Sequence, residues 1–113
     1  MEEIAKNLAG VFYIATAEGD QPHVRPFDGA YAEDGKLYIG TASGKDVYKQ
    51  ILANPKVEIF TMEDGQMTRF MAEAYPVADE AENERLYEKI GKEYKAGAAT
   101  LELKELHGGT IGA

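Results

Sequence analysis

The segment between residues 41 and 48 carries the side chains best suited to binding an anion. Thr41 and Ser43 have hydroxyls, Lys45 has a cation, and the apolar spacing that follows predicts a helix from Lys45 onward. The start of a helix leaves backbone N–H groups free and has a partial positive charge, and both favour a phosphate. Taken alone, however, this pattern is more typical of a serine that caps a helix and a lysine in water.

Arg25 is a second candidate for an anion site. It precedes Pro26 inside a strand-like run, and proline occurs within strands only at edges or bulges because it cannot donate to the ladder. Its guanidinium could form forked hydrogen bonds to phosphate, or Arg25 could be an ordinary surface residue of an edge strand. The net charge of −8 means that an anionic ligand needs locally concentrated positive charge. We expect Arg25 and Lys45 to lie on neighbouring strands of one hairpin, which makes the pair more informative than either residue.

Alternating apolar residues and turn signals predict the elements that would position these side chains. Asp34-Gly35 and Asp64-Gly65 each separate two strand-like runs, which is typical of a hairpin. The expected strands cover residues 11–16, 23–31, 36–41, 56–62, 67–75 and 98–106.

Two stretches have helical spacing instead. Residues 45–53 end at Asn54-Pro55, and residues 80–94 follow Asp79, which forms a capping-box pattern with Glu82. The sum is a mainly β, α+β domain over residues 1–113, with six antiparallel strands that close a small barrel and two flanking helices. The glycine-rich residues 107–113 are expected to form a loose tail.

Taken together, these motifs resemble the small members of the pyridoxamine 5′-phosphate oxidase-like family of FMN-binding split barrels. The resemblance covers roughly residues 8–95, and its pieces are specific only as a set. They are Phe12-Tyr13-Ile14-Ala15-Thr16, Pro22-x-Val24-Arg25-Pro26-Phe27, Gly35-Lys36-Leu37-Tyr38-Ile39-Gly40-Thr41, Ser43-x-Lys45-Asp46-Val47-Tyr48 and Asn54-Pro55-Lys56-Val57-Glu58.

The resemblance implies an antiparallel split β-barrel that holds FMN at the interface of a homodimer. By this analogy, Arg25, Ser43 and Lys45 would bind the phosphate, and the main chain of Pro26 and Phe27 would lie against the flavin ring. Thr41 and Gln50 would be polar neighbours of the cofactor. No side chain is identified as a catalytic acid or base.

The resulting hypothesis is a flavoprotein oxidoreductase of unknown substrate, in which FMN transfers the electrons. One alternative is a non-catalytic module that binds flavin or another phosphorylated ligand. Another is a shortened or redesigned barrel scaffold, because relatives commonly end in a longer final strand than this glycine-rich tail suggests.

Composition argues against several other classes of protein. The negative charge disfavours nucleic acid and anionic membranes as partners, and no apolar run approaches the roughly 20 residues that span a bilayer. The chain has no cysteine, and His23 and His107 are its two histidines, so no metal site is expected. We expect a cytoplasmic protein.

Overall fold

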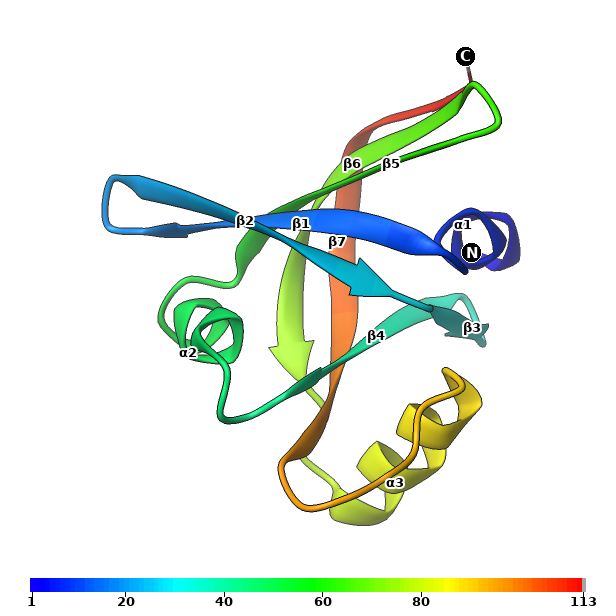
Figure 1. The fold of residues 1–113 in the computed structure, drawn as a ribbon. Helices are drawn as coiled ribbons and strands as arrows, with labels where there is room; N and C mark the ends of the chain where they lie inside the picture. Colours follow the sequence, from blue (N-terminus) through cyan, green and yellow to red (C-terminus); the bar gives the residue numbers. More distant parts are fainter. Residues whose placement is uncertain (113) are drawn as a thin grey trace.

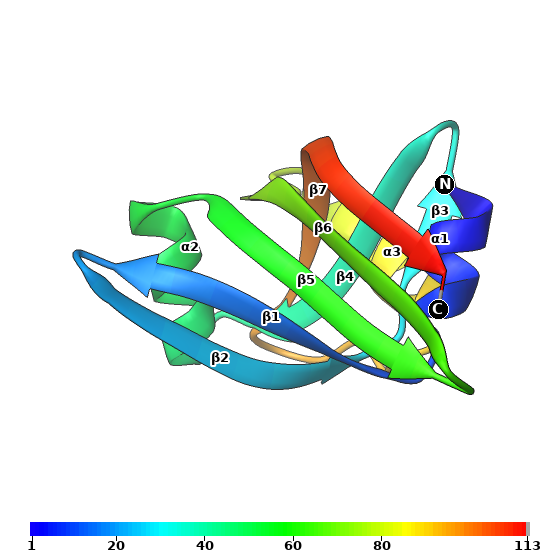
Figure 2. The ribbon, with the colours of Figure 1, turned by 90° about the horizontal axis from the view of Figure 1, so that it is seen from above.

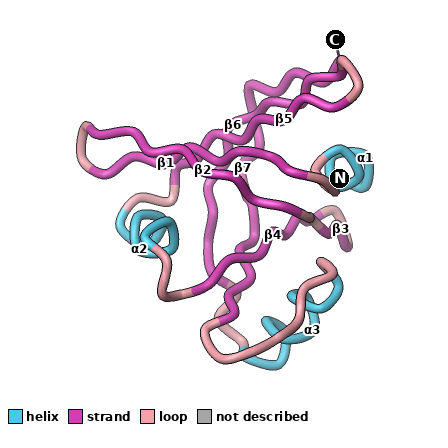
Figure 3. The backbone as a smooth tube through the Cα atoms, in the orientation of Figure 1, coloured by secondary structure: helices cyan, strands magenta, loops and turns pink. Residues whose placement is uncertain are grey.

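A computed structural model describes residues 1–112, which form one seven-stranded antiparallel sheet and three short helices (Figures 1 and 3). The strands are β1 (Val11–Glu18), β2 (Gln21–Asp28), β3 (Tyr31–Glu33), β4 (Lys36–Ala42), β5 (Lys56–Glu63), β6 (Gln66–Pro76) and β7 (Ala98–Gly112). The helices are α1 (Glu2–Asn7), α2 (Asp46–Ala53) and α3 (Glu80–Lys89). The mainly β, α+β prediction is therefore confirmed, whereas the expected six strands and two helices are corrected to seven and three.

The additional strand arises because the expected run of residues 23–31 is broken at Gly29. Gly29 adopts a φ of +83°, which only glycine reaches easily, and the chain changes direction there. The strand order is β2-β1-β5-β6-β7-β4-β3, so β2 and β3 end up at opposite edges of the sheet. Figure 2 shows that the sheet is strongly twisted, which brings β2 near β4 across its open side.

The additional helix, α1, is too short for a helical period to be recognised in the sequence. It is stable in place because Ala5 and the following Leu8 are buried in the core. Its charges also suit the helix dipole, with Glu2 and Glu3 in the first turn and Lys6 in the last. Within residues 1–112, no helix is long and apolar enough to cross a membrane.

The carboxyl-terminal segment is the main correction to the sequence-based expectation. Residues 107–112 continue β7 instead of forming a loose tail, and β7 pairs with β6 as far as Met67 opposite Gly112. Position 113 of the expected tail lies outside the described residues. The glycine-rich sequence suits this strand because its register is irregular, and Gly108 has a φ of +65°.

The two hairpin turns and the proline-containing edge strand are confirmed. Asp34-Gly35 joins β3 to β4, and Asp64-Gly65 joins β5 to β6. Strand β2, which contains Pro22 and Pro26, pairs with β1 and is an edge of the sheet. The core fills the concave side, and its largest fully buried apolar side chains are Leu8, Phe12, Ile14, Leu37, Ile39, Ile51, Ile59 and Leu101.

Helix α3 covers β4 and the start of β7. The Asp79 carboxylate accepts a hydrogen bond from the Glu82 backbone N–H at 3.0 Å, so the expected helix start is confirmed, while the helix ends at Lys89 and not near residue 94. Buried Asn83 accepts from the Thr100 backbone N–H at 2.7 Å. A Cβ added at Gly40 would lie 3.1 Å from the Tyr87 ring, so glycine permits this close packing.

Shortening the chain tests the role of the carboxyl-terminal segment. A chain ending at Leu106 loses the pairing of residues 107–112 with β6, and each lost hydrogen bond contributes roughly 0.5–1.5 kcal/mol. We expect its free energy of unfolding, measured with urea, to fall by about 2 kcal/mol or more. A chain ending at Gly112 is the control. Equal stability of the two shortened chains would contradict the strand assignment.

An ion pair that joins β3 to α3 predicts a dependence of stability on pH. The Arg85 guanidinium donates two hydrogen bonds to the Glu33 carboxylate, at 2.8 and 2.7 Å, and lowers the pKa of Glu33 from 4.5 to about 2. Because the pKa of Glu33 is lower in the folded state, its ionised carboxylate stabilises the protein at pH values above the unfolded pKa. This stabilisation is lost as the pH falls through the folded pKa. Glu33→Gln should therefore be less stable than wild type at pH 6, and the difference should shrink between about pH 5 and pH 2. Urea unfolding of both proteins across this range measures it, and a constant difference would contradict the pairing.

Candidate functional site

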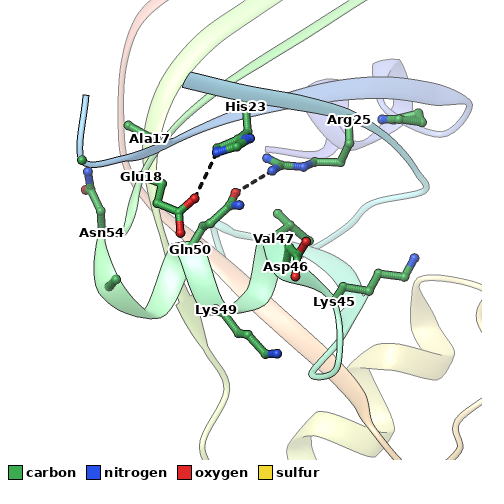
Figure 4. A pocket seen from close by; sticks show the side chains of 13 residues that line it. Ala17, Glu18, His23, Arg25, Lys45, Asp46, Val47, Lys49, Gln50 and Asn54 are labelled. Atoms are coloured by element: carbon green, nitrogen blue, oxygen red, sulfur yellow. Dashed lines mark hydrogen bonds and ion pairs between the residues drawn. The ribbon is translucent and has the colours of Figure 1, made fainter. Parts of the chain in front are cut away.

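A cavity of about 770 Å³ lies between the hairpin of β1 and β2 and helix α2 (Figure 4). This volume is within the range of roughly 300–1,000 Å³ that is typical of small-molecule sites. The residues that line it are Ala17, Glu18, Gly19, His23, Arg25, Pro26, Lys45, Asp46, Val47, Lys49, Gln50, Ala53 and Asn54. Four of the seven residues predicted from the sequence therefore meet here: Arg25, Pro26, Lys45 and Gln50.

The Arg25 guanidinium is held in the wall of the cavity by hydrogen bonds. Its Nη2 donates to Gln50 Oε1 at 2.6 Å, and its Nη1 donates to Thr16 Oγ1 at 2.8 Å and to the Ile14 carbonyl at 3.4 Å. Figure 4 shows Arg25 and Gln50 pointing toward each other across the space between β2 and α2. The side chain reaches inward because Arg25 lies on the face of β2 that turns toward the core, as the alternating burial along the strand requires.

The cavity is more positive than the rest of the chain. Arg25, Lys45 and Lys49 line it together with two carboxylates, Glu18 and Asp46, in a protein of net charge −8. Burial lowers the pKa of the Arg25 guanidinium below its ordinary value, and the attraction of Asp46 opposes this to a smaller extent. Among side chains of residues 1–109, neither Arg25 nor Lys45 takes part in an ion pair. Their charges are thus available to an anion.

Lys45 lines the cavity from a different structural element than the sequence predicted. It is the N-cap residue of α2 and is exposed, whereas Arg25 lies on β2. The expectation that the two residues lie on neighbouring strands of one hairpin is wrong, because β2 pairs with β1 and β4 pairs with β3 and β7. The twist of the sheet brings β2 near β4, and the start of α2 follows β4 directly.

The other three predicted residues lie outside this cavity. Ser43 lines a separate cavity of about 630 Å³ near α3, and its backbone N–H donates to the Gly97 carbonyl at 2.7 Å. Phe27 packs on the core, with its ring centroid 5.8 Å from that of Phe12. Thr41 is buried in β4, and its Oγ1 has no hydrogen-bond partner within the described part of the chain.

Sequence reasoning did not include His23 and Glu18 in the site, although both line the cavity. His23 Nε2 lies 3.2 Å from Glu18 Oε1 at its outer end (Figure 4). The sequence could have indicated His23, since residues two apart on a strand share a face and Arg25 is two residues further on. Glu18 is brought to the cavity by the pairing of β1 with β2, which the sequence does not display.

The sequence comparisons point to one family. The profile of the family described as pyridoxamine 5′-phosphate oxidase matches residues 2–109. No curated protein matches the chain closely enough to indicate a relationship.

Solved structures agree with this result. The chain is similar to a NimC/NimA family protein from Clostridium acetobutylicum, with 37% identity and a TM-score of 0.86 over 98% of this chain and 86% of that one. It shares its fold with a pyridoxamine 5′-phosphate oxidase-related, FMN-binding protein from Nostoc punctiforme, at 15% identity and a TM-score of 0.73 over 91% of this chain and 78% of that one. An F420 reductase matches at 14% identity and a TM-score of 0.70, over 96% of this chain and 94% of the reductase. The chain belongs to the pyridoxamine 5′-phosphate oxidase family.

Proposed function

We propose that this protein is an FMN-binding flavoprotein that holds the cofactor phosphate in the cavity lined by Arg25 and Lys45. The observation that carries the proposal is a half-buried guanidinium in the cavity wall whose charge no carboxylate pairs within the described residues. Arginine binds phosphate in forked geometry, and hydrogen bonds between ionised groups are among the stronger ones.

The residues around Arg25 fit a phosphorylated ligand. Lys45 adds a second cation at the first turn of α2, where free backbone N–H groups also favour an anion. We assign Arg25 and Lys45 to the phosphate and Pro26 to contact with the rest of the cofactor.

The reaction proposed for this site is an oxidation–reduction with an electron donor and substrate still to be identified. FMN supplies the electron transfer when it is bound, and the protein supplies binding, orientation and electrostatics. The Nostoc punctiforme protein named as FMN-binding and the F420 reductase have the same fold, which makes flavin-like cofactors the first candidates.

Spectroscopy tests both parts of the proposal. Protein mixed with FMN and then desalted should keep the flavin absorption bands, and NADH or NADPH should bleach them. Loss of the flavin on desalting, with no quenching of its fluorescence, would refute cofactor binding. Bound flavin that neither nucleotide reduces would favour the non-catalytic binding module.

We also propose that the protein is a homodimer that associates through the outer face of β1, β5 and β6. Tyr13 and Met71 are 44% and 41% exposed, and the strand register places Tyr13 opposite Phe60 and Met71 opposite Glu58. Exposed aromatic and methionine side chains are enriched at protein interfaces.

Replacing Lys45 tests the phosphate assignment. Lys45→Ala removes one hydrogen bond to a charged group, which is worth roughly 1.5–3 kcal/mol, so FMN should bind about ten- to a hundredfold more weakly. Riboflavin lacks the phosphate, so its affinity should hardly change. Flavin fluorescence titrations measure both ligands, and Lys89→Ala on the exposed face of α3 is the matched control. Equal losses for FMN and riboflavin would show that Lys45 does not act through the phosphate.

Replacing Met71 tests the proposed dimer face. Light scattering should give twice the chain mass of 12.4 kDa for the wild type. Met71→Glu places a carboxylate beside Glu58 on the same face and should shift the mass toward one chain. Leu52→Glu adds the same charge at an exposed position on α2 and should leave the mass unchanged. A wild-type mass of one chain with FMN present would overturn the dimer.

A further inference from the structure

Thr16 and Gln50 together form a buried clamp around the Arg25 guanidinium. Thr16 is 3% exposed and Gln50 is 8% exposed, and they belong to β1 and α2 respectively. Thr16 Oγ1 donates to Gln50 Oε1 at 2.6 Å, and both atoms accept a hydrogen bond from Arg25. Three separate elements therefore converge on one cationic side chain.

The direction of each hydrogen bond in the clamp follows from the groups involved. A guanidinium only donates, so Gln50 must turn its carbonyl oxygen, and not its NH₂ group, toward Arg25. The hydroxyl of Thr16 has a single proton, which it gives to Gln50 Oε1, and this leaves its lone pairs free for Arg25 Nη1. Each hydrogen bond of the clamp thus joins a donor to an acceptor, and together they hold the guanidinium in one orientation.

All of the acceptors in the clamp are neutral. The third, the Ile14 carbonyl, is also uncharged. Three of the five N–H donors of Arg25 are used in the clamp, so two remain for a ligand. A carboxylate at position 50 would hold the guanidinium equally well, but it would also neutralise its charge. The glutamine holds the side chain without cancelling the positive charge.

We propose that Gln50, supported by Thr16, is a positioning residue that keeps Arg25 oriented and electrically unpaired for the phosphate of the ligand. This role rests on the proposed phosphate site and differs from a direct contact between Gln50 and the cofactor. Thr16 touches Arg25 and Gln50 but does not line the cavity. Any effect of Thr16 on ligand affinity must therefore pass through these two residues, and a loss confined to FMN identifies the phosphate-binding guanidinium as the group affected.

The main test replaces Gln50 by its charged isostere. Gln50→Glu keeps the shape and an acceptor oxygen but pairs Arg25 with a carboxylate. Fluorescence titration should show FMN binding about ten- to a hundredfold more weakly, while riboflavin binding stays within about twofold. Gln21→Glu is the matched control, because it makes the same substitution at an exposed position on β2. It should leave both affinities unchanged.

A second pair of variants keeps the test informative if Gln50→Glu folds poorly. Thr16→Val preserves the volume but removes the hydroxyl, so FMN should bind at least threefold more weakly, with riboflavin unaffected. Thr16→Ser restores the hydroxyl and should restore FMN binding. Thermal unfolding of each variant confirms that the titrated protein is folded.

The ratio of riboflavin to FMN dissociation constants separates the possible failures. A wild-type ratio near one would refute the phosphate site itself, and the clamp with it. A high wild-type ratio that folded Gln50→Glu or Thr16→Val retains would overturn the clamp and leave the phosphate site standing. A fall in the ratio for Gln21→Glu equal to that for Gln50→Glu would also overturn the clamp, since overall charge would then explain the effect.

Discussion

The pairing of β7 with two strands is the constraint on which the rest of the structure depends. β7 pairs with β6 on one side and with β4 on the other, so it connects the β3–β4 hairpin to the remainder of the sheet. Leu101 and Leu103 of β7 also belong to the buried core. Helix α2 follows β4 directly, whereas Arg25 belongs to β2 at the far edge of the sheet. The distance between Arg25 and Lys45 is therefore set by β7, although β7 contributes no residue to the site.

Arg25 and Arg85 illustrate different uses of the same side chain. Arg85 is partly exposed and binds the Glu33 carboxylate in forked geometry, so its charge is matched within the protein. Arg25 is held by neutral oxygens, and burial disfavours its charged form. A partly desolvated charge without a counter-charge stabilises the fold less than a matched one does. Perturbed ionisable groups of this kind are enriched at functional sites.

Local sequence patterns predicted the elements well, because strand alternation and Asp-Gly turns depend on neighbouring residues alone. They also brought Arg25 and Lys45 onto the list of site residues, whereas Gln50 was added only by the family resemblance. They missed the break at Gly29, because a glycine within an extended run does not reveal whether the strand continues. They also misread the glycine-rich segment after Leu106, where pairing with β6 overrides the weak strand preference of glycine. The hydrogen bonds of Thr16 could not be predicted from the sequence, since they depend on how three elements that are distant in the chain pack together.

The two prolines of β2 have a consequence for how copies of this protein can meet. β2 is an edge strand, and an unprotected edge can recruit a strand from another molecule and extend the sheet without limit. Pro22 and Pro26 each remove a backbone donor from that strand, which interrupts the row of groups that a foreign strand would need. Growth into fibrillar aggregates through this edge is thereby disfavoured. The dimer proposed above would instead use side-chain contacts on the outer face of the sheet, and such an association ends once two copies have met.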